Sequence, residues 1–209
     1  MKNWVSSGIA TVIILIAIML VVITAASVLT EETTTTTTEE QDLEQITQEV
    51  IDEICSYIQI KDEKGKYYNM DGEPKIQKIA LLISPLVSQN IDMTQLTIQI
   101  DNGETLRMLY YNSNSAKIGS QSLFEHSLWN DLNIENFGLI SIMDIDESII
   151  NYHILNENSD NVYLVFKLPP DMQMSKYDKI KVTLFPSSGI TRTTTLTAPM
   201  PMKSIITFE

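Results

Sequence analysis

The N-terminal stretch constrains this chain more than any other feature. From Val5 to Thr30 no side chain carries a charge. As an α-helix this run of about 26 residues is roughly 39 Å long, enough to cross a hydrocarbon core of about 30 Å. The sequence therefore predicts a long hydrophobic helix at residues 1–30 that contacts lipid or other apolar helices.

Three interpretations of this helix remain open from its chemistry. It is a cleaved signal peptide, a permanent single-pass anchor, or a helix that leaves the membrane to pack against copies of itself. Small residues allow apolar helices to approach closely. Those in the run are Gly8, Ala10, Thr11, Ala17, Thr24, Ala25, Ala26 and Ser27.

A strongly acidic segment follows the apolar run. The chain has a net charge of −13, and nine acidic residues with no lysine or arginine lie between Glu31 and Glu53. This balance argues against nucleic acid as a partner, because no basic patch is available to neutralise phosphates. Six consecutive threonines, Thr33–Thr38, lower helix propensity, so we expect the packed helix to end near Leu29.

Helical periodicity returns after the threonines. Apolar residues recur at spacings of three and four, which predicts an amphipathic helix. They are Leu43, Ile46, Val50, Ile54, Tyr57 and Ile58. We therefore expect residues 31–58 to form an acidic Thr-rich neck with an amphipathic helix.

Residues 59–209 are predicted to form one β-domain. Short apolar or alternating segments are separated by Pro, Gly and Asn-Gly turn signals, as in all-β sandwiches and barrels. The expected strands are Lys75–Ile83, Thr97–Ile100, Thr105–Tyr111, Asn161–Leu168, Asp178–Phe185, Ile190–Thr197 and Ser204–Phe208. Asn102-Gly103 predicts a hairpin turn, and Gln121–Leu132 is expected to form one short helix.

The chain shows no catalytic constellation. His126 and His153 lack metal-ligand spacing and are expected to be structural or surface residues. Cys55 is the only cysteine, so no intrachain disulfide is possible. One weak metal candidate remains, the loop acids Asp144, Asp146 and Glu147, because Ca²⁺ requires several oxygen ligands together.

Both ends of the apolar run carry a resemblance to a known family. Gly8-Ile9-Ala10-Thr11 opens an Ala/Val/Ile-rich helix that ends in Ala26-Ser27-Val28-Leu29. This pattern resembles the N-terminal helix of archaellins, which are filament subunits of the archaeal swimming organelle, within the type IV pilin-like superfamily. Residues 84–111 and 161–201 resemble that family's hairpin and its closing strands.

The resemblance implies an α+β fold, with the long hydrophobic helix followed by an immunoglobulin-like β-sandwich. It implies a structural subunit, not an enzyme, that polymerises through this helix into the extracellular archaellum filament used for swimming. No cofactor is implied. The residues expected to pack in the filament core are Gly8, Ile9, Ala10, Thr11, Ile13, Ile16, Ala17, Leu20, Val21, Thr24, Ala25, Ser27, Val28 and Leu29.

The same resemblance also implies the partners of this chain. They are copies of this chain or a paralogous archaellin, a prepilin-type peptidase, the basal machinery, and the cytoplasmic membrane before assembly. Family precursors carry a short basic leader, from which Met1-Lys2-Asn3-Trp4 departs. We therefore expect either that Met1 begins the mature chain or that the processing signal is degenerate.

Two alternatives keep the same helix and β-domain. One is a type IV adhesion pilin, and the other is a membrane-anchored β-sandwich stator or envelope protein with the neck as a stalk. In a filament, the neck carboxylates of neighbouring copies would repel one another over a Debye length of about 8 Å. Bound cations or the lysines of the domain are expected to offset them, namely Lys61, Lys64, Lys66, Lys75 and Lys78.

Overall fold

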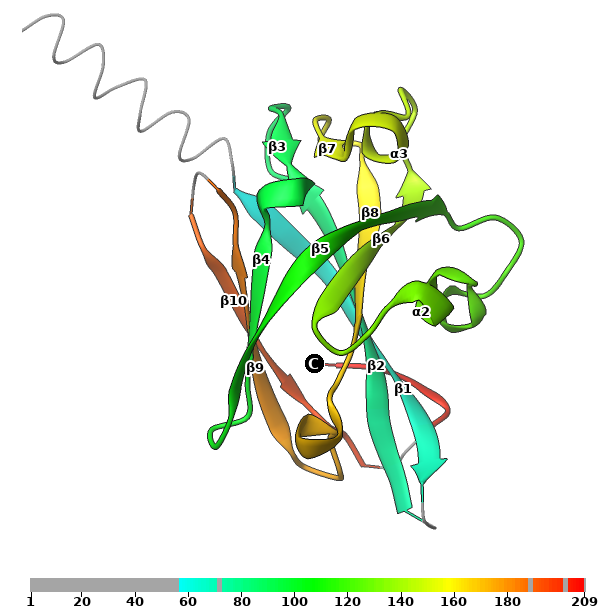
Figure 1. The fold of residues 1–209 in the computed structure, drawn as a ribbon, viewed down its shortest axis with the longest axis vertical. Helices are drawn as coiled ribbons and strands as arrows, with labels where there is room; N and C mark the ends of the chain where they lie inside the picture. The colour runs from blue at the N-terminus through cyan, green and yellow to red at the C-terminus, as the bar shows by residue number, and fades with distance from the viewer. Residues whose placement is uncertain (1–56, 71–72, 188–189, 201–202, 209) are drawn as a thin grey trace, which may run out of the picture. The chain divides into compact units, whose positions relative to one another are not determined.

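The computed structural model describes residues 57–70, 73–187, 190–200 and 203–208. The predicted apolar helix and nearly all of the neck lie outside these residues. Within the described part of the chain, no helix is long and apolar enough to span a bilayer. The described residues form a β-domain with a few short helical turns (Figure 1).

Nine of the described strands form one mixed sheet in the order β10-β9-β4-β5-β6-β8-β2-β1-β11, and β3 pairs with β7 separately. Neighbours are antiparallel except for the parallel pair of β5 and β6. The strands are β1 Ile58–Met70, β2 Glu73–Pro85, β3 Ile91–Asp92, β4 Thr97–Asp101, β5 Leu106–Lys117, β6 Asn136–Met143, β7 Ile154–Leu155, β8 Asn161–Lys167, β9 Lys179–Phe185, β10 Arg192–Thr197 and β11 Ile205–Thr207. The helical turns are η1 Met93–Gln95, η2 Leu123–Glu125, α2 Leu128–Asp131, α3 Ser148–Tyr152 and η3 Pro170–Met172. Each expected strand segment overlaps one of these strands to within two residues at the ends it shares, which confirms the predicted β character of this part of the chain.

The structure adds a long strand that the sequence did not predict. Strand β1 pairs with β2 along its whole length, from Ile58 opposite Pro85 to Met70 opposite Glu73. Ile58 therefore begins a strand instead of ending the amphipathic neck helix, because its side chain is buried in the domain core. The rest of β1 is rich in charge, so its apolar face is hard to recognise in the sequence.

Gly65 in the middle of β1 allows the last strand to pack closely. A Cβ at this position would lie 2.9 Å from Cζ of Phe208 and 3.1 Å from Cγ2 of Ile76. The Phe208 ring therefore occupies the space that a side chain on β1 would fill. This contact seals the interior where β11 pairs with β1.

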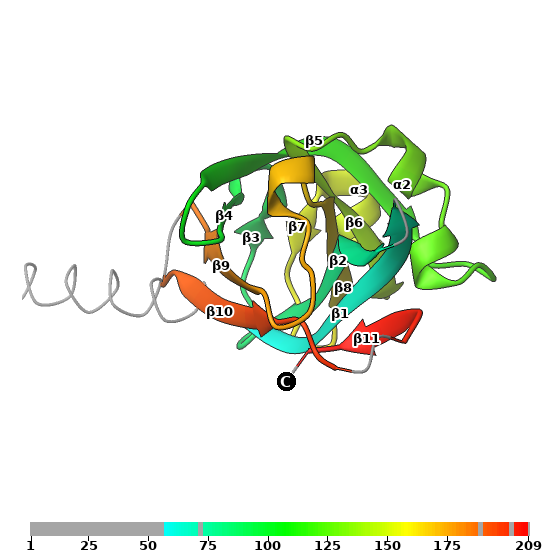
Figure 2. The same cartoon turned by 90° about the horizontal axis from the view of Figure 1, so that it is seen from below.

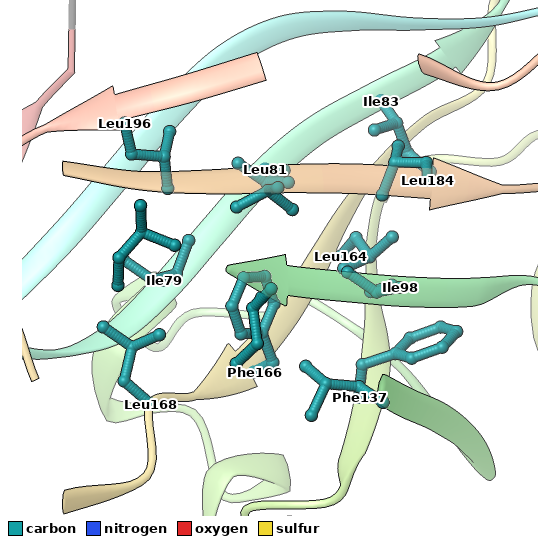
Figure 3. Close-up of a cluster of buried hydrophobic side chains, with 14 of the residues drawn as sticks. Ile79, Leu81, Ile83, Ile98, Phe137, Leu164, Phe166, Leu168, Leu184 and Leu196 are labelled. Atoms are coloured by element: carbon teal, nitrogen blue, oxygen red, sulfur yellow. The ribbon is translucent and has the colours of Figure 1, made fainter. Parts of the chain in front are cut away.

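The sheet curves so that its two halves enclose one core. Seen from below, the strands surround the interior, and β10 lies close to β1 (Figure 2). Thr194 Oγ1 on β10 donates a hydrogen bond to Glu63 Oε1 on β1. Side chains from β4, β9 and β10 meet those of β2, β6 and β8, including Ile98, Leu184, Leu196, Leu81, Phe137 and Phe166 (Figure 3). Burial of this apolar surface favours the closed arrangement.

The Asn-Gly hairpin is present as predicted between β4 and β5. Gly103 has a φ of 89°, which glycine adopts without steric cost. The Asp101 carboxylate accepts a hydrogen bond from the Gly103 N–H at 2.8 Å, and Asn102 Oδ1 accepts one from the Thr105 N–H at 2.7 Å. These side-chain bonds hold the turn in place.

The segment 121–132 folds as two turns, η2 and α2, instead of the one short helix expected. His126 between them is extended, with φ −61° and ψ 140°. The turns place Phe124, Leu128, Trp129 and Leu132 on Ala80, Ile140, Tyr163 and Val165. A second, smaller apolar cluster therefore covers the outer face of β2, β6 and β8.

Candidate functional site

Three aspartates meet where β6 ends and β8 begins. Asp144 and Asp146 follow β6, whereas Asp160 directly precedes β8. Because these two strands are antiparallel neighbours, the end of one lies beside the start of the other. Carboxylate oxygens of the three residues lie within 4.8 Å of one another, and we call this group the acid cluster.

The acid cluster contains carboxylate oxygens that are buried without a partner. Asp160 is fully buried; its Oδ2 accepts hydrogen bonds from the N–H groups of Asn156 at 3.1 Å and Glu157 at 2.9 Å. Its Oδ1 and both carboxylate oxygens of Asp144 have no hydrogen-bond partner among the described residues. Burying a charge without a partner is costly, so this arrangement calls for a proton or a cation.

The electrostatics of the acid cluster differ from one member to the next. Burial raises the pKa of Asp144, and the adjacent Asp146 and Asp160 raise it further. Burial is also the main reason why the pKa of Asp160 is raised. Hydrogen bonds from Asn156 and Ser148 lower the pKa of Asp146 to about 2. Asp146 therefore stays ionised beside two carboxyl groups whose charge is poorly solvated.

The chemistry of these ligands fits a hard divalent cation. Ca²⁺ prefers about six to eight oxygen ligands, which carboxylates, carbonyls and water supply. The three carboxylates would provide the charge, and their unpartnered oxygens provide coordination sites. A cation there would join the loop after β6 to the start of β8.

Only two of the three predicted metal candidates lie together in the structure. Asp144 and Asp146 do lie together, but the third carboxylate is that of Asp160. Glu147 instead pairs with Lys117, with Oε1 2.6 Å from Nζ. Sequence reasoning missed Asp160 because it is separated from Asp146 by helix α3 and strand β7. The only feature of the local sequence that could have indicated Asp160 is its position one residue before the predicted strand Asn161–Leu168.

Both histidines have structural surroundings. His126 Nε2 lies 3.1 Å from the Lys117 carbonyl oxygen, and Nδ1 accepts a hydrogen bond from the Leu128 N–H at 3.2 Å. These two contacts require the neutral tautomer with its proton on Nε2. His153 ends α3 and places Nδ1 2.9 Å from the Tyr111 hydroxyl. Neither ring belongs to the acid cluster.

The predicted filament-core positions, from Gly8 to Leu29, lie outside the described residues. Their packing therefore stays a prediction. A family comparison does include these positions.

The profile of the family "Archaeal-type flagellin" matches residues 6–196, which span the apolar run, the neck and most of the β-domain. The chain belongs to the archaeal-type flagellin family. This confirms the resemblance to archaellins inferred from the sequence.

Individual archaeal flagellins support the family assignment. Flagellin B3 of Methanocaldococcus jannaschii is 30% identical over 111 residues, which cover 51% of this chain and 50% of that protein. The match thus spans about half the length of this relative.

Two solved flagellin structures share the fold. Flagellin FlaB1 from Methanocaldococcus jannaschii superposes with a TM-score of 0.63 at 19% identity, over 72% of this chain and 95% of that one. The archaeal flagellum of Methanospirillum hungatei strain JF1 gives a TM-score of 0.54 at 13% identity, over 97% and 99% of the two chains.

Proposed function

We propose that this chain is a structural subunit of an archaellum filament. The observation that carries the proposal is the family match over residues 6–196, because it covers both the apolar run and most of the β-domain. A subunit of this kind performs no chemistry. It transmits torque through non-covalent contacts with its neighbours.

We infer that the apolar helix is the polymerising element. In the membrane its side chains are solvated by lipid, and in a filament they are buried by copies of the same helix. Contacts between two different surfaces of each copy, repeated without closing a ring, produce an open helical polymer. The β-domains, which we expect to be immunoglobulin-like sandwiches, would coat this bundle outside the cell.

The remaining partners follow from the same assembly route. A prepilin-type peptidase would process the precursor, and the basal machinery would extract each subunit from the cytoplasmic membrane. The filament would contain this chain alone or together with a paralogous archaellin.

Mass spectrometry of filaments sheared from cells tests the proposal directly. We expect peptides of this chain in the purified filaments seen by electron microscopy. If the chain is recovered from membranes and never from filaments, the subunit proposal is wrong and the envelope-anchored alternative is favoured. If it is found in filaments of cells that attach but do not swim, the adhesion pilin is favoured.

A charged residue in the apolar helix tests the role of that helix. Replacing Ile16 or Val21 with aspartate should abolish incorporation, because an unpaired buried charge costs several kcal/mol or more. Ile134→Asp is a matched control, since the Ile134 side chain is 43% exposed on the β-domain. Normal filaments from Ile16→Asp cells would contradict the helix-bundle model.

We further propose that the acid cluster binds a structural Ca²⁺ ion. The support is the buried Oδ1 of Asp160 and the two buried oxygens of Asp144, which have no partner among the described residues. The ion would stabilise the loops at one end of the β-domain and take no part in a reaction.

A further inference from the structure

Nearly half of the basic residues of this acidic protein lie on one face of the β-domain. The chain has 14 lysines and arginines in total. Six of them lie on β1, β2 and β8, and four of these contact residues at the outer cluster, namely Tyr163, Glu125, Phe124 and Leu132. We call these six lysines the lysine face. Its members are Lys61, Lys64, Lys66, Lys75, Lys78 and Lys167.

Strand register brings these lysines together. Lys66 lies directly opposite Lys78 on β2, and Lys78 lies directly opposite Lys167 on β8. Lys75 lies opposite Tyr68, whose ring also faces Lys66 and Lys78. Like charges directly opposite each other across a ladder are unfavourable. Burial lowers the pKa of Lys78 and of Lys167, and a neighbouring lysine adds to the shift in each case.

Most polar partners of the lysine face are neutral. Lys78 Nζ donates to the Phe124 carbonyl at 3.2 Å and lies 4.8 Å from the centre of the Trp129 ring. Lys167 Nζ donates to the Leu132 carbonyl at 2.7 Å. These contacts position the ammonium groups without cancelling their charge.

Only two carboxylates of the described residues form ion pairs with this face. Asp62 pairs with Lys64, and Glu125, whose side chain is 72% exposed, pairs with Lys66 at 3.3 Å. Four of the six lysines therefore form no ion pair with a carboxylate of the described residues. An acidic partner would complete the pairing.

The same chain contains a matching acidic segment. Residues 31–53 carry nine carboxylates and no basic residue, so the remainder of the chain has a net charge of only −4 (−13 minus −9). In a filament of identical copies, both the acidic segment and the lysine face are repeated once per subunit. Every lysine face thus has an acidic segment of another copy as a possible counterpart.

We propose that the lysine face of one copy docks the acidic segment 31–53 of a neighbouring copy. This inference rests on the proposed filament function. The contact would offset the repulsion among neck carboxylates where many copies assemble, and it would contribute orientation as well as affinity. Because the pairs are partly exposed, assembly would weaken as salt is raised.

Charge reversal tests the docking surface. The test variant is Lys61→Glu/Lys75→Glu, because Lys61 is exposed with Asn161 as its polar partner and Lys75 lies at the edge of the hairpin. The matched control is Lys179→Glu/Lys181→Glu, which makes the same charge change at two exposed positions on β9. We expect filament yield to fall about tenfold or more for the test variant, with control filaments near wild-type yield. Circular dichroism and the thermal midpoint of the purified full-length chains establish that both variants fold.

Co-expression identifies which copy supplies the acidic segment. The complementary variant is Glu39→Lys/Glu40→Lys, which should also assemble poorly alone. If the contact joins neighbouring copies, co-expressing the two variants restores mixed filaments. Rescue only when all four substitutions are in one chain would overturn docking between neighbours.

Two further outcomes would count against the proposal. Normal filaments from the folded test variant would overturn it, and so would an equal loss with the control variant, because the effect would then be one of net charge. Absence of the wild-type chain from filaments would instead refute the proposed function. The two failures are therefore distinguishable.

Discussion

The acid cluster and the lysine face both place charged side chains near the protein interior, but these side chains differ in their polar partners. In the acid cluster, Asp160 is fully buried and one of its oxygens has no partner among the described residues. On the lysine face, the Lys78 and Lys167 ammonium groups donate to the carbonyls of Phe124 and Leu132, and long side chains of this kind keep the charged group at the surface. The short side chain of Asp160 cannot reach solvent in this way, so its charge calls for a proton or for the cation proposed above.

Among the changes proposed for the two regions, removal of Ca²⁺ is expected to lower the stability of the protein most. A ligand that binds only the folded state at about 100 times its Kd stabilises by about 2.7 kcal/mol. We therefore expect Ca²⁺ to raise the thermal midpoint of the purified full-length chain above its value in chelator. An identical midpoint in Ca²⁺ and in chelator would refute the cation site.

Asp160→Asn should separate the ligand role of this residue from its structural role. The asparagine oxygen still accepts the two backbone hydrogen bonds from Asn156 and Glu157, so stability in chelator should stay the same or rise. The response to Ca²⁺ should be lost, because one buried negative ligand is gone. Isothermal titration with Ca²⁺ and melting in chelator measure the two effects. An unchanged titration would show that Asp160 is not a ligand.

Lys78→Met should have a smaller effect than removal of Ca²⁺. Methionine preserves the packing on Trp129 but loses a cation–π contact of about 0.5–1 kcal/mol, and it also relieves the burial of an ammonium group. The expected net change in unfolding free energy at neutral pH is therefore below about 1 kcal/mol. A loss as large as that from removing Ca²⁺ would show that the contacts of Lys78 with the Phe124 carbonyl and the Trp129 ring contribute more than a cation–π contact.

The same variant predicts a pH dependence. Burial lowers the pKa of Lys78 below its ordinary value of 10.5, so the unfolded state binds the proton more tightly than the folded state. Stability from this group therefore rises as pH increases through its folded pKa towards 10.5. The wild type should gain stability relative to Lys78→Met over this alkaline range. Parallel pH profiles in urea denaturation would contradict the shift.

Glu147→Gln should have the smallest effect. It breaks the pair with Lys117, in which both side chains are about half exposed, and such surface pairs contribute little. We expect no resolvable change in thermal midpoint and an undiminished response to Ca²⁺. Loss of that response would place Glu147 in the cation site, as the sequence had suggested.

Local sequence patterns predicted much of the β-domain. In Asp178–Phe185 the apolar residues alternate because one side faces the core, whereas Asn161–Leu168 is apolar on both sides because the core and the second cluster bury its two faces. Asn102-Gly103 is a typical hairpin-turn pair. Strand β1 escaped prediction because its outer face carries lysines and its inner face includes Gly65. The segment 121–132 was predicted as one helix because its apolar spacing does not reveal the extended backbone at His126.

The sequence by itself determined the family, the apolar N-terminal run, the concentration of acid in residues 31–53 and the β-character of the domain. These are properties of composition and of spacing along the chain. Only the tertiary structure decided that Asp160 joins Asp144 and Asp146, and that Lys66, Lys78 and Lys167 lie side by side. Strand pairing joins residues that are far apart in sequence, and local spacing contains no record of which strands will pair.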